Sequence, residues 1–504
     1  YRVSRKEKTW MQCGGSKTLL SGGCLKKRER SLAKRMATKE PALLIPVENQ
    51  VRELDGKLLL ACIAARRGFP SIIGPKRELE SRMRKLSFPR SIYLAKSLQR
   101  GHQKFFQAAR KLGHEIAAWD EEALIHLPAE NYYSRRLWPQ SMACVSHLFA
   151  WGQDNAELWR QYRELPAGTP IHITGNPRGD LLRAELRGYY QHKVEELQQA
   201  YGDFILINTN FGYVNAITPD RNLILPANKS GEPPKFGHKA RGMTREYAEG
   251  LHDHKQATFE HFQKMIPELE KAFPDYTIVV RPHQVESQDI YQRIAAQCKR
   301  VRVTNEGNVV PWLLAAKAML HNGCTTGVEA YALGVPSLAY RAKVNEQFDH
   351  DFHELANQLS HQCFDFAELQ HTLKKILAGE VVGEDEDEKK ALIKHHLAAL
   401  SGPLACERIV DVLLKIADDL SKMPNPPVRD RVKNWFKATK YRWRKRSQSR
   451  NTGSHSSLEY HRHKYSGISP DDLLERIGRF QQVLKDDGEL NVNHIYPRFF
   501  RFSE

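Results

Sequence analysis

The sequence predicts an α/β protein of two tandem domains, each built on a parallel sheet with helices on both faces. Short apolar strands alternate with helical patterns, first from about residue 36 and again from about residue 186. Such alternation is typical of βαβ units in a doubly wound, Rossmann-like sheet. The length of 504 residues also exceeds what one hydrophobic core usually supports.

The first domain is predicted over residues 36–185. It opens with a buried apolar strand at 42–47, followed by a helix at 58–68 that ends at Gly68, since glycine commonly ends helices. The other expected strands cover 69–74, 91–95, 114–119, 145–151 and 171–174, and the other expected helices cover 102–112 and 155–164.

The second domain is predicted over residues 186–400, with a closing helix at 401–420. A polar segment with several Gly and Pro residues, about 212–241, interrupts it and is expected to form a mobile loop near a ligand cleft. The expected strands cover 203–208, 276–280, 300–304, 317–321 and 337–340, and the expected helices cover 189–201, 244–272, 288–298, 366–378 and 389–420.

The stretch 317–340 reads as one βαβ unit. An apolar strand leads to Thr325-Thr326-Gly327, where a helix begins that ends at Gly334. Free backbone N–H groups and two hydroxyls at a helix start favour an anion such as phosphate. The alternative is an ordinary capped helix.

Positive charge is concentrated at the two ends of the chain. Residues 1–35 hold 11 Lys and Arg against 2 acidic residues, residues 421–504 hold 18 against 9, and the segment between them is neutral with 48 of each. Residues 1–35 lack periodicity and are expected to be a disordered extension, with the native protein starting at Met36. Residues 421–504 are expected to form a basic tail.

The segment 433–446 in that tail carries basic residues with interleaved aromatics. Such a segment favours an anionic membrane surface; a solvated disordered tail is the alternative, and nucleic acid is the less favoured partner. No apolar run reaches the ~20 residues of a membrane-spanning helix. The eight cysteines are scattered without a CxxC pair, which fits a reducing cytoplasm.

Two tandem doubly wound domains place a ligand between the carboxyl ends of both sheets. Thr325 and Thr326 would face a phosphate there, and His283, which follows a strand, would donate a hydrogen bond to it or protonate it. Glu329 lies one turn past Thr325 and would accept ribose hydroxyls; a plain first-turn carboxylate is the alternative. Cys324 beside this loop is more simply a small buried residue than a nucleophile.

A general base is expected from the first domain, where acidic residues follow two strands. The candidates are Glu48, Glu53, Asp55, Asp120, Glu121 and Glu122, of which Glu53, Asp55, Glu121 and Glu122 are the preferred catalytic residues, together with His283. The alternative is that most of these carboxylates form a solvated acidic face. Arg178 and Asp180 are expected to bind each other or an interdomain hinge.

Several of these motifs together resemble one family. They are Arg52-Glu-Leu-Asp55, Ile173-Thr-Gly-Asn-Pro-Arg-Gly-Asp180, Ile205-Leu-Ile-Asn-Thr-Asn210, Arg281-Pro-His283 and His321-Asn-Gly-Cys-Thr-Thr-Gly-Val-Glu-Ala330 with Gly334-Val-Pro336. Over about residues 40–420 the chain is similar to the bacterial surface carbohydrate (polysaccharide) biosynthesis proteins, which resemble glycosyltransferases of the GT-B type. The second motif is also similar to one of wall teichoic acid glycerophosphotransferases, and the fourth and fifth motifs together are similar to the nucleotide-binding motifs of sialyl- and Kdo-transferases.

The resemblance implies a GT-B-like fold with an interdomain cleft. It implies donor binding by Arg281, His283, His321, Asn322, Cys324, Thr325, Thr326, Gly327 and Glu329, and cleft or hinge roles for Gly175, Asn176, Arg178, Asp180, Asn208 and Asn210. Capsule-type Kdo transferases carry an Asp-containing segment where this chain has Asn208-Thr-Asn210, so a covalent Asp mechanism is not expected. Retention and inversion both stay open.

The implied activity is transfer of a sugar from a nucleotide-activated donor to a glycan or lipid-linked acceptor, by an enzyme in the cytoplasm or at the inner face of the membrane. A CDP-alditol phosphotransferase, a UDP-sugar 2-epimerase and a non-enzymatic nucleotide-sugar-binding scaffold are the alternatives. No cofactor is expected beyond the nucleotide sugar as substrate. No metal is expected either, so activity should persist in EDTA.

Overall fold

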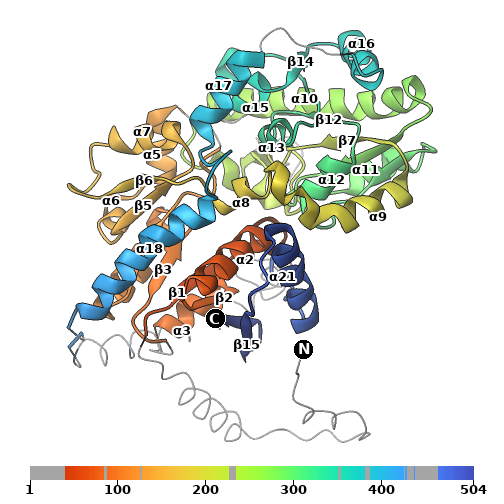
Figure 1. The fold of residues 1–504 in the computed structure, drawn as a ribbon. Coiled ribbons are helices and arrows are strands. Elements are labelled where there is room, and N and C mark those ends of the chain that lie inside the picture. The colour runs from red at the N-terminus through yellow and green to blue at the C-terminus, as the bar shows by residue number, and fades with distance from the viewer. Residues whose placement is uncertain are drawn as a thin grey trace, which may run out of the picture.

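Two parallel sheets form the centres of two domains (Figure 1). The computed structural model describes residues 40–84, 88–124, 128–225, 234–349, 354–380, 386–424, 426, 427, 429, 436 and 464–504. Within these residues the sheet orders are β15-β16-β2-β1-β3-β4-β5-β6 and β11-β10-β7-β12-β13-β14. The predicted fold class is thereby confirmed: this is an α/β protein with a GT-B-like arrangement of two Rossmann-like domains.

The N-terminal sheet is built mainly from parallel strands whose residues are almost all buried. Its strands in the first part of the chain are β1 (Leu43–Val47), β2 (Ser71–Pro75), β3 (Ile92–Ala95), β4 (Glu115–Ala118), β5 (His147–Ala150) and β6 (Ile171–Ile173). The helices between and after them are α2 (Gln50–Arg66), α3 (Lys76–Met83), α4 (Gln103–Lys111), α5 (Ala129–Arg136), α6 (Pro139–Met142), α7 (Gln153–Arg160) and α8 (Pro177–Asp180). Helix α2 is buried along most of its length, because it packs against the sheet on one side and other helices on the other.

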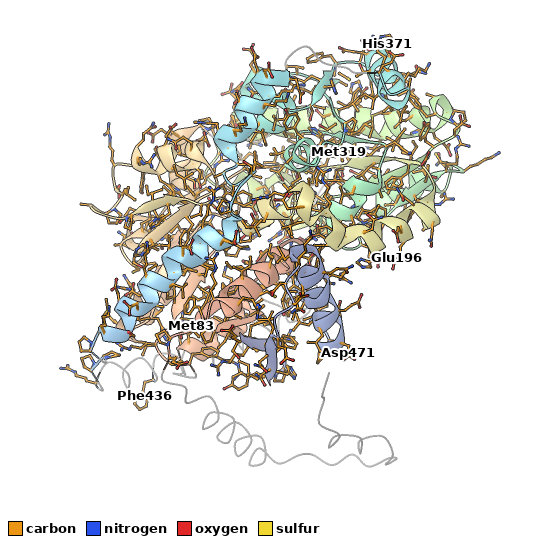
Figure 2. The ribbon with its side chains drawn as sticks, in the orientation of Figure 1. Met83, Glu196, Met319, His371, Phe436 and Asp471 are labelled. Carbon is orange, nitrogen blue, oxygen red and sulfur yellow. The ribbon has the colours of Figure 1, made fainter. Side chains whose placement is uncertain are left out.

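The C-terminal sheet is parallel throughout, and its central strands end at the cleft described below. The strands are β7 (Phe204–Asn208), β10 (Thr277–Arg281), β11 (Val301–Val303), β12 (Ala318–His321), β13 (Ser337–Tyr340) and β14 (His361–Cys363). The helices are η2 (Ala184–Tyr190), α9 (Gln191–Tyr201), α10 (Arg245–Ala272), α11 (Asp289–Ala295), α12 (Val309–Ala315), α13 (Thr326–Leu333), α14 (Glu346–Asp349), α15 (Glu354–Gln358), α16 (Phe366–Leu377) and α17 (Glu386–His396). Figure 2 shows Met319 of β12 inside this domain, where it is fully buried, and His371 of α16 at its far surface.

The polar segment 212–241 contains short structure of its own. Where the structure describes it, it forms η3 (Pro219–Arg221), the antiparallel pair β8 (Ile224–Leu225) and β9 (Lys235–Phe236), and η4 (His238–Ala240). Leu223 and Ala240 are buried in a small cluster with Ala248 and Leu251 of α10. Local apolar packing therefore anchors this insertion to α10.

The helix predicted at 389–420 is two helices, and the second of them corresponds to the closing helix predicted at 401–420. Helix α17 ends at His396, and α18 (Ala405–Lys422) begins after a break in which Ala399 has a positive φ of 61°. Helix α18 leaves the C-terminal domain and packs on α2 and α8 of the N-terminal domain, burying Ile409, Val410 and Leu413. The chain thus returns to its first domain after completing the second.

The last part of the chain differs from the predicted basic tail. Residues 464–504 form α21 (Pro470–Leu484), β15 (Asn491–Tyr496) and β16 (Phe499–Ser503), and β16 pairs antiparallel with β2 at the edge of the N-terminal sheet. Figure 1 shows α21, in dark blue, beside α2. The segment folds because it is amphipathic: Ile477, Phe480 and Phe502 are buried in the same core as α2.

Two further predictions concern the ends of the chain. Residues 1–35 lie outside the described residues, and so does all of 433–446 except Phe436. Among the residues that the structure describes, no helix combines the length and apolar character needed to cross a membrane.

Candidate active site

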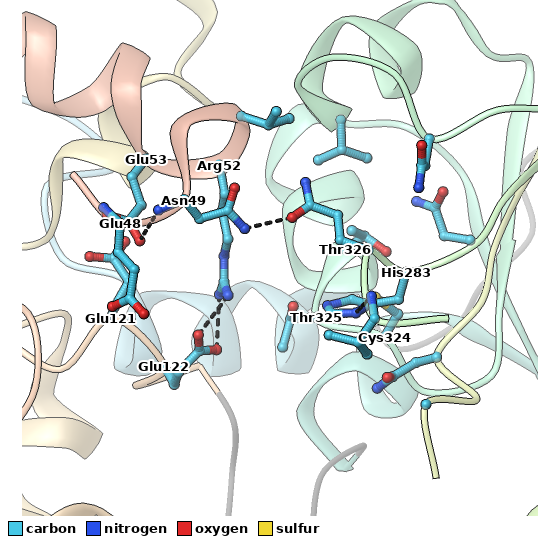
Figure 3. A pocket seen from close by; sticks show the side chains of 18 of the residues that line it. Glu48, Asn49, Arg52, Glu53, Glu121, Glu122, His283, Cys324, Thr325 and Thr326 are labelled. Carbon is cyan, nitrogen blue, oxygen red and sulfur yellow. Dashed lines mark hydrogen bonds and ion pairs between the residues drawn. The ribbon is translucent and has the colours of Figure 1, made fainter. Parts of the chain in front are cut away.

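A cavity of about 920 Å³ lies between the two domains. Its lining includes the segments that follow β1, β3 and β4 in the N-terminal domain and those that follow β7, β10 and β12 in the C-terminal domain. In Figure 3, Glu48, Glu53 and Glu121 lie on one side, His283, Cys324, Thr325 and Thr326 on the other, and Arg52 between them. The carboxyl ends of both sheets therefore meet at one cleft, as doubly wound domains predict.

The loop after β12 is ordered by a buried histidine. His321 Nδ1 accepts hydrogen bonds from the backbone N–H groups of Gly323 (2.9 Å) and Cys324 (3.3 Å), and its Nε2 lies 2.9 Å from Ser360 Oγ. This pattern assigns the imidazole proton to Nε2, and burial lowers the pKa of His321 to about 3. A Cβ atom at Gly327 would lie 2.7 Å from that nitrogen, so Gly327 permits the close approach. His321 and Gly327 shape the loop and are absent from the cavity lining.

Helix α13 begins at this loop with its first residues on the cavity. Thr325 is the N-cap residue, and its side chain makes no capping hydrogen bond. Thr326 Oγ1 is buried and has no hydrogen-bond partner among the described residues apart from the Cys324 thiol. Cys324 itself is buried, which raises the pKa of its thiol, so it is not an activated nucleophile. The two threonines therefore present hydroxyls at the start of a helix.

Asn208 ends the neighbouring strand β7 and carries a buried amide donor. Asn208 is 3% exposed and lines the cavity, and its Nδ2 has no hydrogen-bond partner within the described part of the chain. Strand β7 pairs directly with β12, with Asn208 opposite His321. Asn322 Oδ1 accepts a hydrogen bond from the backbone N–H of Asn210 at 2.8 Å, which ties the two loops together. A buried donor without a partner is costly, so both loops are prepared for an acceptor from a ligand.

His283 lies on the same wall, after β10. Its Nδ1 accepts the backbone N–H of Val285 at 3.3 Å, which leaves the proton on Nε2. His283 lines the cavity, and its ring has open surface only toward that space. Desolvation by the surrounding walls lowers the pKa of His283 to about 4, and Arg52 and Lys239 act in the same direction. At neutral pH His283 is therefore an uncharged hydrogen-bond donor.

Glu286 holds the His283 loop. Its carboxylate accepts hydrogen bonds from the His283 backbone N–H (3.0 Å), the Thr209 hydroxyl (3.0 Å) and the Tyr291 hydroxyl (2.8 Å). Burial raises the pKa of Glu286 to about 7.

Arg281 is in the lining but is held by the protein itself. Its guanidinium donates to the carbonyls of Glu306 (2.8 Å) and Gly307 (3.1 Å) and lies 4.6 Å from the centre of the Trp312 ring. Burial lowers its pKa to about 9. These contacts position the loop before α12. They also engage the Arg281 guanidinium, which the sequence suggested for donor binding.

The carboxylates predicted on the opposite wall are mostly engaged in ion pairs. Glu53 is 1% exposed, pairs with Lys57 (2.7 Å) and Lys96, and accepts the backbone N–H groups of Glu48 and Asn49. The nearby lysines hold the pKa of Glu53 well below its usual range, against the effect of burial. Glu53 therefore caps the start of α2 and positions two lysines.

Glu122 forms a two-pronged ion pair with Arg52 at 2.6 and 3.0 Å (Figure 3). Arg52 lowers the pKa of Glu122 to about 2, although burial opposes the shift.

Glu121 is held less tightly than Glu53 and Glu122. One of its oxygens accepts the Trp119 indole N–H at 2.9 Å and lies 4.0 Å from Lys57 Nζ, whereas the other has no hydrogen bond among the described residues and lies 3.9 Å from Arg178.

Asp55 is not at the cleft. It is absent from the cavity lining, and its oxygens accept from the Tyr189 hydroxyl (2.9 Å), the Asn308 side chain (2.9 Å) and Arg476 (2.6 Å). Helical periodicity explains the error, because Asp55 lies two residues past Glu53 and so faces away from it on α2. Asp55 joins α2, the C-terminal domain and α21.

Arg178 and Asp180 do not bind each other. Arg178 pairs with Glu329 of α13 across the cleft, so the predicted hinge role is the one its position fits. Asp180 accepts the backbone N–H groups of Ala405 (2.7 Å) and Cys406 (2.8 Å) and thereby caps α18, while burial raises its pKa to about 6.

Gly175 and Asn176 shape the turn before α8. Gly175 has a φ of 83°, and a Cβ atom there would lie 2.8 Å from the carbonyl oxygen of Ala398. Asn176 caps α8 by accepting the backbone N–H of Arg178 at 3.0 Å. Both residues support the interdomain connection and are outside the cavity lining.

The comparisons with known proteins bear on the fold. No protein-family model matches the sequence, and no curated protein matches it either. Among solved structures, the chain is similar to the UDP-GlcNAc 2-epimerase of Methanocaldococcus jannaschii in complex with UDP-GlcNAc and UDP (13% identity, TM-score 0.43, 74% of this chain and 99% of that chain). It is also similar to the UDP-GlcNAc 2-epimerase of Neisseria meningitidis bound to UDP-GlcNAc (13%, 0.44, 74% and 100%). A third is the wall teichoic acid polymerase TagF (11%, 0.42, 79% and 95%). At such identities these likenesses to GT-B-fold proteins concern the fold and assign no activity.

Most of the cations in the cleft do not follow from the sequence motifs. Ten Lys and Arg side chains line the cavity, against five glutamates, so the cleft carries a surplus of positive charge. The cations are Arg52, Lys76, Lys96, Arg136, Arg178, Arg221, Lys239, Lys255, Arg281 and Lys464. Lys76 and Lys96 directly follow β2 and β3, so the rule that points to strand ends would have found these two.

The described part of the chain offers no cluster of metal ligands. There, no three His, Cys, Asp or Glu side chains are grouped so that they would hold a metal ion.

Proposed function

We propose that this protein is a glycosyltransferase of the GT-B type that takes a sugar from a nucleotide-activated donor and passes it to an acceptor in the same cleft. The assembly of a bacterial surface polysaccharide is the proposed setting. One observation carries the proposal: two buried polar groups face the cavity side by side, Asn208 Nδ2 at the end of β7, which has no partner among the described residues, and Thr326 Oγ1 at the start of α13, whose one partner there is the Cys324 thiol. A nucleotide phosphate would satisfy both.

Transfer forms a bond between an acceptor oxygen and the anomeric carbon of the donor and breaks the bond from that carbon to the phosphate oxygen. The electron pair of the broken bond goes to the phosphate. Preorganised donors stabilise such developing charge most effectively in a site shielded from water. Thr325, Thr326, Asn208 and the N-terminus of α13 would supply them, and neutral His283 would donate through Nε2–H.

The acceptor hydroxyl must also lose its proton, and we assign the base to Glu121. It lines the cavity and keeps one oxygen without a hydrogen bond among the described residues. Glu122 is a weaker base because Arg52 binds both of its oxygens. Glu53 is enclosed by lysines and backbone donors and acts as a positioning residue.

The two-sided cleft favours transfer over epimerisation and over binding without turnover. Epimerisation of a nucleotide sugar needs no acceptor, yet the cavity includes a wall of charged residues from the N-terminal domain. A scaffold without turnover would leave unexplained a carboxylate oxygen available as a base. A CDP-alditol phosphotransferase would use the same phosphate site and differs in the group transferred.

Thermal denaturation with a panel of CMP-, CDP-, UDP- and GDP-linked compounds tests the proposal. One nucleotide class should raise the melting temperature, and the double variant Thr325→Ala/Thr326→Ala should lose this shift. Thr372→Ala on α16, outside the cavity lining, is the matched control and should retain it. No shift with any nucleotide would contradict the proposal, and conversion of the sugar without an acceptor would identify an epimerase instead.

A further inference from the structure

One buried carboxyl group lies behind the C-terminal wall of the cavity. Glu286 is 1% exposed and is absent from the cavity lining, whereas Thr209 and His283, which it contacts, both line the cavity. Glu286 therefore does not face a ligand itself, but it holds residues that do.

The Glu286 carboxyl group joins the two loops that carry proposed phosphate donors. On one side it accepts the Thr209 hydroxyl at 3.0 Å, and Thr209 directly follows Asn208, the last residue of β7. On the other side it accepts the backbone N–H of His283 at 3.0 Å, and the backbone N–H of Glu286 donates in return to the His283 carbonyl at 2.8 Å. One carboxyl group thus helps to place both the Asn208 amide and the His283 ring.

Every hydrogen bond to this carboxyl group comes from an uncharged donor. Besides the Thr209 hydroxyl and the His283 backbone, the donors are the Tyr291 hydroxyl of α11 at 2.8 Å and the backbone N–H of Phe211. Within the described part of the chain Glu286 forms no ion pair. An ionised Glu286 is therefore a buried charge without a counter-ion, which is costly.

The described residues that contact Glu286 carry no charge at neutral pH. Asn215 and Ala216, which pair with its loop from the polar insertion, are uncharged, and burial raises the pKa of Tyr291 well above its usual range. Burial lowers the pKa of His283 to about 4, so its ring is neutral as well. Because burial also raises the pKa of Glu286 to about 7, this carboxyl group exchanges its proton near neutral pH.

The two hydroxyls beside Glu286 can accommodate either protonation state. Thr209 Oγ1 and the Tyr291 oxygen lie 3.1 Å apart, and a hydroxyl can donate or accept. When Glu286 is ionised, both hydroxyls donate to it. When it is protonated, its O–H can donate to Thr209, Thr209 to Tyr291, and Tyr291 back to the carboxyl group, so every buried polar group keeps a partner.

We propose that Glu286 is a positioning residue for the donor phosphate, and that it takes up a proton from the solvent when the nucleotide binds. This inference rests on the proposed function for the place of the phosphate. A phosphate bonded to the Asn208 amide and the His283 ring would lie across one loop from the Glu286 carboxyl group, in surroundings where like charges repel strongly. Binding of the anion should therefore favour the neutral carboxyl group, which keeps its contacts with both loops.

Titration calorimetry on the full chain tests the proton uptake. The probe is the intact nucleotide sugar that raises the melting temperature most in the thermal panel, because a phosphodiester lacks the second ionisation near pH 6 of a phosphate monoester. Titrations at pH 8 in Hepes and in Tris, which differ in ionisation enthalpy, should show uptake of about half a proton or more per nucleotide. From pH 6 to pH 8 the affinity of the wild type should fall about five- to tenfold.

Glu286→Gln fixes the neutral state in nearly the same shape. At pH 8 this variant should bind the nucleotide about five- to tenfold more tightly than the wild type, at pH 6 equally tightly, and without proton uptake. A structural role alone would not make the variant bind more tightly. Glu270→Gln is the matched control and should behave as the wild type, because Glu270 of α10 is also buried, accepts a backbone N–H from Arg300 and lies outside the cavity lining.

Tyr291→Phe tests the same point without removing the carboxyl group. Loss of one donor disfavours the ionised form of Glu286, so the fall in nucleotide affinity should move to higher pH. Proton uptake in Glu286→Gln equal to that of the wild type would overturn the inference and assign the proton to another group, such as Lys239 in the cavity lining. Weaker binding by Glu286→Gln at every pH would also overturn it.

A separate assay of sugar transfer distinguishes this inference from the proposed function. Proton uptake that depends on Glu286, without transfer to any acceptor, would refute the proposed function and leave the inference standing. Transfer by a protein whose nucleotide affinity does not change from pH 6 to pH 8 would do the reverse. No binding of any nucleotide would overturn both.

Discussion

The guanidinium of Arg178 on α8 donates a hydrogen bond to the carboxylate of Glu329 on α13, so an ion pair spans the two domains at the cleft. Both side chains line the cavity and are largely buried, at 11% and 7% exposure. A second interdomain link runs from Asp55 of α2 to Asn308 at 2.9 Å. The relative position of the two walls therefore depends on these polar contacts as well as on the apolar core that the two domains share.

Arg178→Ala should destabilise the protein by about 3 kcal/mol, because removing one partner leaves the buried Glu329 charge uncompensated. The urea midpoint of unfolding measures the change. Arg67→Ala is the control, since Arg67 pairs with Glu407 at 3.2 Å with both side chains about one-third exposed, and such a pair contributes less than about 1 kcal/mol. If the double variant Arg178→Ala/Glu329→Ala lost as much free energy of unfolding as the sum of the two single variants, the two residues would have no coupling energy.

His283→Ala should lower kcat by about 10²- to 10³-fold, the usual loss when one preorganised donor to a developing charge is removed. Because the pKa of His283 is lowered to about 4, His283 should not titrate near pH 6.5. The pH profiles of kcat for wild type and variant should therefore have the same shape in that range. Steady-state kinetics from pH 5 to 9 measures both effects. His371→Ala on α16, far from the cleft (Figure 2), should leave kcat unchanged; an equal loss there would remove the assigned role.

Glu286 should make stability fall as pH rises from about 4.5 to about 7. Burial raises its pKa from 4.5 to about 7 in the folded protein, so the folded state binds more protons than the unfolded state in this window, and stability decreases with pH. Glu286→Gln removes this titration. Relative to wild type, the variant should gain up to about 3 kcal/mol between pH 4.5 and pH 8, as urea unfolding at several pH values would show. A pH-independent difference would mean that Glu286 is ionised throughout.

The strands and most helices of both domains follow from the sequence because local periodicity encodes them. Strands β7, β10 and β12 appear where apolar runs predict them, and the rule on carboxyl strand ends brings His283 and Thr325 to one cleft. Side-chain partners are a different matter. The pairing of Arg178 with Glu329, or of Asp55 with Tyr189, joins residues more than a hundred positions apart, and no local pattern specifies it.

The C-terminal segment shows the same limit from another direction. Ser469 and Pro470 are a recognisable helix start, and the Ser469 side chain does cap α21. The basic composition of residues 421–504 as a whole hides this local signal. Its docking place, the edge strand β2, is set by the exposed edge of a sheet formed about 400 residues earlier, which the segment itself does not encode.

Phe480→Ala should destabilise the N-terminal domain by about 3 to 5 kcal/mol, the usual cost of removing a buried aromatic ring. Phe480 is 1% exposed, and its ring stacks on Tyr189 with 3.9 Å between centroids; Tyr189 in turn donates to Asp55. Leu474→Ala on the same helix, where Leu474 is 52% exposed, is the matched control and should change stability by less than about 0.5 kcal/mol. Urea unfolding measures both variants, and hydrogen exchange at β16 should rise only in Phe480→Ala. Equal stability of the two variants would show that α21 does not contribute to the core.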